Sequence, residues 1–170
     1  TFLMNVEALR YLGLRKENKI INPENRILIC GDFNKKINNK LLDLNSRLSK
    51  IREVDFLPHP TISKNIPSRN VVNGKLIDLI KKYNIVITSS MSSSAVDAYE
   101  NLKIVYQLTG EGTLNFTALR GFEDVLIFDD IEDLILSIKN KEYHIGLRKE
   151  NYFYDNTNLE KWSKFLHSFN

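Results

Sequence analysis

The residues best suited to chemistry form a run of hydroxyl side chains after a short apolar stretch. Residues 85–88 favour a buried strand, and the spacing of apolar residues over 95–99 predicts a helix. Between them lie five serines, which are Ser89, Ser90, Ser92, Ser93 and Ser94. A joint from strand to helix offers free backbone N–H groups, the positive end of the helix dipole and O–H donors. The stretch therefore predicts an anion site, with phosphate as its natural ligand.

The alternative is that Ser92 to Ser94 only cap the helix. Ser94 and Asp97 have the spacing of a capping box, in which one hydroxyl and one acidic side chain satisfy the first backbone N–H groups. A cap needs one serine, and this loop carries five.

His59 is the second candidate, and prolines flank it on both sides. Pro58 and Pro60 keep the backbone extended, so His59 is predicted at the carboxyl end of a strand over 53–60. A lone histidine is more often a structural residue of a turn. At a strand end, facing a second loop suited to anions, it is a candidate to hydrogen-bond a phosphate or a carboxylate.

The sequence lacks the motifs of several well-known kinds of binding and catalytic site. Gly31 stands alone where a dinucleotide site would need G-x-G-x-x-G, and no G-x-S-x-G surrounds Ser89 or Ser93. The sequence has no H-E-x-x-H and no cysteine cluster, and the pair Asp129-Asp130 suits the start of a helix. We therefore predict no metal and no cofactor. The single cysteine, Cys30, lies in an apolar run and is expected in the core.

The elements that must position these residues alternate between strands and helices. Short apolar runs predict strands over 26–33, 53–60, 85–88, 103–108 and 125–128. Helical spacing predicts helices over 37–51, 76–80, 95–99 and 131–138. This alternation predicts an α/β Rossmann-like fold, a parallel sheet with helices on both faces. Ligands bind such sheets at the carboxyl ends of the strands, where His59, the serine loop and the loop 109–115 should lie.

Composition limits the remaining classes. The 170 residues are 42% apolar, which suits one core, and the net charge of +3 comes without a basic run for nucleic acid. No apolar run is long enough for a membrane span and no signal peptide is present, so a soluble, cytoplasmic domain is expected. Because the chain opens on Thr1, we expect a missing N-terminal part, with 1–25 as a lead-in helix and linker from it.

The two motifs together resemble a known family. Leu57-Pro58-His59-Pro60, followed about thirty residues later by the segment from Ile87 to Ala98, resembles the nucleotide-binding C-terminal half of a GT-B glycosyltransferase. The nearest group is the bacterial sialyltransferases and capsule or lipopolysaccharide transferases, which carry a His-Pro motif and a Ser-Ser/Thr motif. The resemblance covers 26–140, which is the expected nucleotide-binding domain, and leaves 141–170 as a C-terminal strap helix with an aromatic stripe.

The resemblance implies a sugar-nucleotide donor, commonly CMP-activated, held at its phosphate or ribose. The implied ligand-binding residues are His59, Pro60, Ser89, Ser90, Ser92, Ser93, Ser94 and Asp97. Of these, Asp97 falls where related enzymes place an acidic residue on the ribose, and His59 would stabilise the leaving phosphate. The sequence departs from many relatives at Leu57, where they have Lys, and at 101–103, where they have a Gly-Lys-Pro turn.

The expected function is therefore the donor-binding half of an inverting, metal-independent glycosyltransferase that builds bacterial surface polysaccharide. The sialyltransferases carry their catalytic base in the N-terminal half, which nothing here matches, so the fragment alone should be inactive. Its expected partners are the donor, a glycan acceptor and the missing acceptor-binding domain, through which it would associate peripherally with a membrane. The alternative is a non-catalytic Rossmann-like regulatory or protein-interaction domain.

Overall fold

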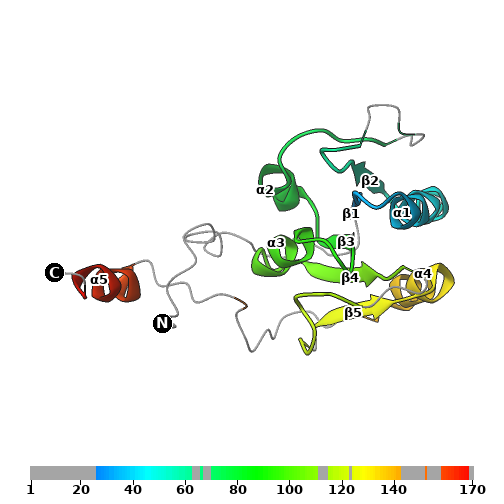
Figure 1. The fold of residues 1–170 in the computed structure, drawn as a ribbon. Helices are drawn as coiled ribbons and strands as arrows, with labels where there is room; N and C mark the ends of the chain where they lie inside the picture. The colour runs from blue at the N-terminus through cyan, green and yellow to red at the C-terminus, as the bar shows by residue number, and fades with distance from the viewer. Residues whose placement is uncertain are drawn as a thin grey trace.

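A five-stranded parallel sheet forms the centre of the computed structural model, which describes residues 26–62, 66, 70–110, 115–122, 124–142, 152 and 158–168 (Figure 1). The strands are β1 (Ile27–Cys30), β2 (Val54–Leu57), β3 (Ile85–Ser89), β4 (Ile104–Leu108) and β5 (Val125–Phe128). Their order is β2-β1-β3-β4-β5, and all neighbouring strands run parallel. The predicted α/β Rossmann-like fold is confirmed.

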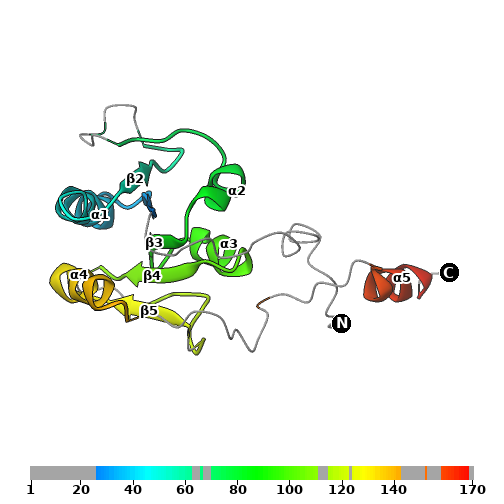
Figure 2. The ribbon, with the colours of Figure 1, turned by 180° about the vertical axis from the view of Figure 1, so that it is seen from behind.

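Helices cover both faces of this sheet. They are α1 (Lys35–Leu48), α2 (Leu76–Leu79) with a 3-10 turn η3 (Ile80–Lys82), α3 (Ser94–Glu100) and α4 (Ile131–Asn140). A further helix, α5 (Glu160–His167), does not cover the sheet. Helices α1 and α4 lie on one face and α2, η3 and α3 on the other (Figures 1 and 2). Their apolar side chains belong to two separate core clusters, one on each face. Because both faces are covered, β1, β3 and β4 are buried along their whole length, which explains their continuous apolar sequences.

A single β-bridge extends the sheet beyond β2. Val71 forms a single parallel bridge with Phe56, in which the Phe56 N–H donates to the Asn70 carbonyl at 2.8 Å and the Val72 N–H donates to the Phe56 carbonyl at 2.9 Å. Counting this bridge as the third position in the chain, the order becomes 3-2-1-4-5-6, that of doubly wound dinucleotide-binding sheets. The order reverses between β1 and β3, and ligands of such sheets bind at that point.

Two further predictions concern the two ends of the chain. The predicted lead-in helix over 1–25 lies outside the described residues. Helix α5 is present, none of its residues is buried, and it lies apart from the sheet in both views. Packing of its aromatic stripe on a neighbouring element stays a prediction. No described helix combines the length and the apolar character needed to cross a bilayer.

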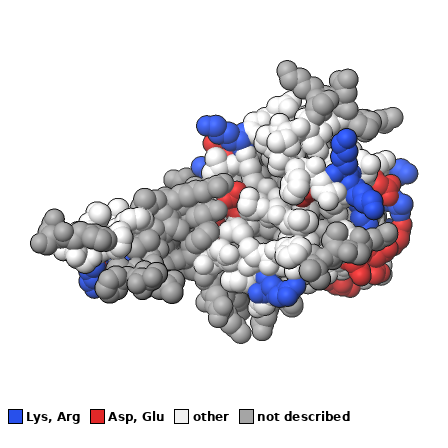
Figure 3. All heavy atoms as spheres, in the orientation of Figure 1, with Lys and Arg blue, Asp and Glu red and all other residues white. Residues whose placement is uncertain are grey.

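Charged side chains are spread over the face seen in Figure 3. Lys and Arg side chains occur there as separate groups, and the described residues form no continuous basic surface on this face. The distribution agrees with the scattered positive charge in the sequence.

Candidate functional site

A cavity of about 670 Å³ opens at the carboxyl ends of β1 and β2, and we call it the His59 cavity. The lining residues come from four chain segments and α3, and they are Cys30 to Phe33, Leu57 to Pro60, Gly74 to Ile77, Met91 to Ser94, and Asp97. Its volume is within the range of roughly 300 to 1,000 Å³ typical of sites for small molecules. The cavity lies where the strand order reverses, the expected place for a ligand in this fold.

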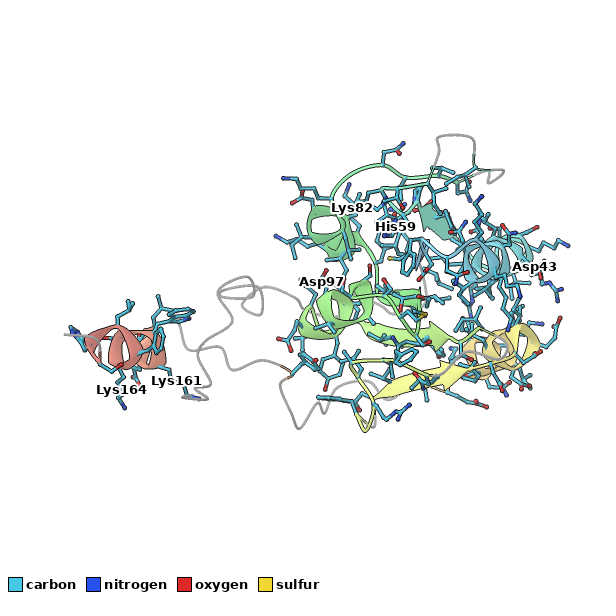
Figure 4. The ribbon with its side chains drawn as sticks, viewed as in Figure 1. Asp43, His59, Lys82, Asp97, Lys161 and Lys164 are labelled. Atoms are coloured by element: carbon cyan, nitrogen blue, oxygen red, sulfur yellow. The ribbon has the colours of Figure 1, made fainter. Side chains whose placement is uncertain are left out.

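His59 presents one ring nitrogen to its own loop. The Thr61 N–H donates to His59 Nδ1 at 3.3 Å, and the Thr61 hydroxyl lies 2.8 Å from the same nitrogen. Because Nδ1 accepts a hydrogen bond, the proton of the neutral ring resides on Nε2, which becomes a donor. The ring also meets Phe33 edge to face, with centroids 6.0 Å apart. Figure 4 labels His59 above Asp97, which comes from α3.

Gly31 allows the end of β1 to approach the His59 loop closely. Its N–H donates to the Leu57 carbonyl at 2.8 Å. A Cβ atom at Gly31 would lie 2.9 Å from Asn38 Oδ1 and 3.1 Å from the His59 backbone nitrogen. A side chain here would therefore displace the segment that carries His59.

Asp32 connects three elements beneath the cavity, and it is 1% exposed. Its carboxylate accepts the Asn34 N–H at 2.7 Å and the Ser89 hydroxyl, while its own N–H donates to Asn38 Oδ1 at 3.1 Å. These bonds hold the end of β1, the start of α1 and the end of β3 together. Sequence reasoning missed this role, although Gly-Asp directly after an apolar strand marks the position.

The serine loop divides between two cavities. Ser92, Ser93 and Ser94 line the His59 cavity, whereas Ser89 and Ser90 line a smaller one of about 340 Å³, which we call the Ser90 cavity. Met91 lines both. Six of the eight sequence-predicted residues are thus brought together at the His59 cavity, which are His59, Pro60, Ser92, Ser93, Ser94 and Asp97.

The capping alternative holds for Ser92, and it does not hold for the capping-box pair of Ser94 and Asp97. Helix α3 begins at Ser94, so Ser94 is its first helical residue, and the preceding Ser93 makes no side-chain cap hydrogen bond. The Ser92 hydroxyl instead accepts the Ser94 N–H at 3.2 Å. Ser92 therefore satisfies a backbone N–H at the start of the helix, whereas Ser94, which the capping-box spacing selects, lies inside the helix.

Asp97 and Cys30 form the buried wall of the His59 cavity, at 4% and 2% exposure. Burial and, to a smaller extent, the Asp97 carboxylate raise the pKa of the Cys30 thiol from 9.0 to about 12, and a hydrogen bond with Ser94 partly opposes them. The thiol stays protonated at neutral pH, which removes its nucleophilic form.

Lys75 is a second residue that sequence reasoning missed. It precedes α2, is exposed, and is the only Lys or Arg among the described residues that line the His59 cavity. A cation here can partly neutralise a bound anion. Its position could have been suspected only from the spatial approach of the loop before α2 to β2, which the Val71 bridge fixes.

The described residues contain no group of three or more His, Cys, Asp or Glu side chains placed to hold a metal ion. Comparison with known protein families finds no family model that matches the chain, and comparison with curated proteins finds no match. A functional proposal must therefore be argued from the geometry and from the resemblance of the two motifs.

Proposed function

We propose that residues 26–140 bind the nucleotide of a CMP-activated sugar, as the donor-binding half of a glycosyltransferase that builds bacterial surface polysaccharide. One observation carries the proposal: His59 and Ser92 to Ser94 line the same cavity. They follow β2 and β3, two strands that β1 separates, so only the fold brings them together. The resemblance of the two motifs supports the same ligand.

The lining side chains suit a phosphate group. The Nε2–H of His59, the hydroxyls of the serine turn and the Lys75 ammonium supply donors from three separate chain segments. Donors fixed around a phosphate stabilise the charge that grows on it when the glycosidic bond to the sugar breaks. His59 would act in this way as a leaving-group stabiliser.

The nucleoside would use the acceptor groups of the cavity. The Asp97 carboxylate, at the buried wall, can accept hydrogen bonds from ribose hydroxyls, which are donors. Exposed Phe33 offers an aromatic face beside His59 on which a base can stack. In this proposal a separate N-terminal domain supplies the catalytic base and binds the glycan acceptor. The protein acts in the cytoplasm, at the inner face of the membrane.

Titration of the protein with CMP, UMP, UDP and GDP, followed by NMR of the backbone amides, tests the proposal. CMP should perturb Gly31, His59 and Ser92 to Ser94 with a saturable dependence on concentration. If none of the four nucleotides perturbs these residues, the donor-binding proposal fails. The regulatory or protein-interaction reading would then replace it.

A further inference from the structure

The Ser90 cavity lies where the start of α1 faces the ends of β3 and β4. Lys36 and Lys40 line it from α1, Ser89 to Met91 from the end of β3, and Gly110 from the segment after β4. At about 340 Å³ it is at the small end of the range for ligand sites. The space suits one compact group, such as a phosphate or a carboxylate, with water.

Ser90 is the residue of this cavity whose hydroxyl is available to bind a ligand. It is 3% exposed, and its N–H donates to the Leu108 carbonyl at 3.1 Å. Its hydroxyl makes no hydrogen bond within the described part of the chain, and Ser90 is one of the residues that line the cavity. The neighbouring Ser89 hydroxyl is already satisfied, since it donates to Asp32 and accepts the Met91 N–H at 3.3 Å. Buried hydroxyls are normally hydrogen-bonded, so Ser90 is available to a bound group.

The charge around Ser90 is positive. Two lysines, Lys36 and Lys40, are among the described lining residues, and no Asp or Glu is. The Lys40 ammonium donates to the Thr109 carbonyl at 3.4 Å and to the Asp129 carbonyl, which holds it at the wall. The Asp32 carboxylate, which accepts the hydroxyl of the neighbouring Ser89 and the Asn34 N–H, lines the His59 cavity instead.

Helix α1 adds to this positive field. It has 14 residues, and its first turn begins at the cavity, where the Asn34 side chain accepts the Lys36 N–H at 2.9 Å. The other N–H groups of a first helical turn have no carbonyl partner within the helix, and the helix dipole places partial positive charge there. Unlike α3, this helix is long enough for that charge to be substantial.

We propose that the Ser90 cavity is an anion subsite that takes a phosphate or a carboxylate, bound by the Ser90 hydroxyl, the Lys36 ammonium and the N-terminus of α1. Met91 lines this cavity and the His59 cavity, so the two cavities adjoin at this residue. We further propose, resting on the proposed function, that the sugar-nucleotide donor carries a second oxyanion group besides the phosphate at His59. The anion binding itself requires no nucleotide.

Inorganic phosphate is the first probe, with backbone-amide NMR as the measurement. Phosphate should perturb Ser90, Met91 and residues 35–37 in the wild-type protein. Lys36→Gln and Ser90→Ala should each weaken this binding, by roughly tenfold for Lys36, where a charged hydrogen bond is lost. Lys35→Gln is the matched control, because it removes the same charge from the adjacent position outside the lining residues. Absence of the perturbation, or an equal loss in Lys35→Gln, overturns the subsite.

CMP and CDP then identify the source of the anion. If the second oxyanion belongs to the donor, CDP binds the wild-type protein more tightly than CMP, and Lys36→Gln removes this difference while leaving the CMP affinity unchanged. If CDP has no advantage and phosphate still binds alongside CMP, the subsite serves a separate anion and the claim about the donor is overturned. If phosphate binds and no nucleotide does, the donor-binding function fails and the subsite remains.

Discussion

At the scale of single residues, the hydrogen bond between His59 and Thr61 decides which ring nitrogen is available. Nδ1 is engaged with Thr61, so Nε2–H is left for a ligand. We predict that His59→Ala weakens CMP binding by roughly tenfold to a hundredfold, since a hydrogen bond to a charged group contributes about 1.5 to 3 kcal/mol. Isothermal titration calorimetry measures the change.

The control for this prediction is His167→Ala, which removes an exposed histidine of α5. It should leave the CMP affinity unchanged. Equal affinity of the His59 variant and the wild-type protein, with the fold intact by circular dichroism, would make His59 a turn residue only.

Cys30 provides a prediction about pH. Burial raises its pKa from 9.0 to about 12, so the unfolded chain loses the thiol proton at lower pH than the folded protein does. The free energy of unfolding is therefore unaffected by Cys30 below pH 9. Between pH 9 and 12 it should fall by up to about 1.4 kcal/mol per pH unit. Urea unfolding at pH 8, 9 and 10 measures the slope.

The comparison for this slope is Cys30→Ala, which should lose less stability per pH unit above pH 9. Burial and a hydrogen bond to Asp55 also raise the pKa of Tyr83, but Tyr83 is present in both proteins and contributes equally. Identical slopes in the two proteins would show that the thiol ionises as readily in the fold as outside it.

At the scale of elements, the turn before α3 separates two roles that the sequence leaves together. The Ser92 hydroxyl accepts the Ser94 N–H, whereas Ser93 caps nothing. Ser92→Ala should therefore lower the free energy of unfolding by about 0.5 to 1 kcal/mol, and Ser93→Ala should change it by only a few tenths. Urea unfolding compares them.

The same pair of variants should weaken CMP binding, because both serines line the His59 cavity. A Ser93 variant with full affinity for CMP would remove that hydroxyl from the proposed site. A Ser93 variant with the larger loss of stability would mean that it forms the cap after all.

The strands could be predicted from the sequence because each is a short, nearly continuous apolar run. All five were placed within a few residues of their observed bounds, and the positions of His59 and the serine loop at strand ends followed from them. The bridge at Val71 could not be predicted, because one paired residue leaves no periodic pattern. The division of the serine loop could not be predicted either, since the side on which each hydroxyl lies depends on backbone torsions of the turn.

At the scale of the whole molecule, the point where the strand order reverses brings together segments that the sequence keeps far apart. Asp32, the end of β2 and the loop before α2 meet the serine turn there. Asp32 escaped prediction because an aspartate after a strand has many uses, and only its bond to Ser89, 57 residues away, distinguishes them. Lys75 could not be predicted for the same reason, because only the fold brings it to the His59 cavity.

The proposed ligand should stabilise the whole domain, because a molecule that binds only the folded state adds to the free energy of unfolding. At 100 times its dissociation constant, CMP should add about 2.7 kcal/mol and raise Tm by roughly 5 to 10 °C in a thermal shift assay. His59→Ala should reduce this rise at the same CMP concentration. EDTA should leave it unchanged, because the Asp32 carboxylate of the His59 cavity is already hydrogen-bonded and the phosphate donors are His, Ser and Lys side chains. If EDTA abolishes the rise, carboxylates of the cavity hold a metal between themselves and the phosphate, and the assignment of phosphate contacts to His59 and the serines is wrong.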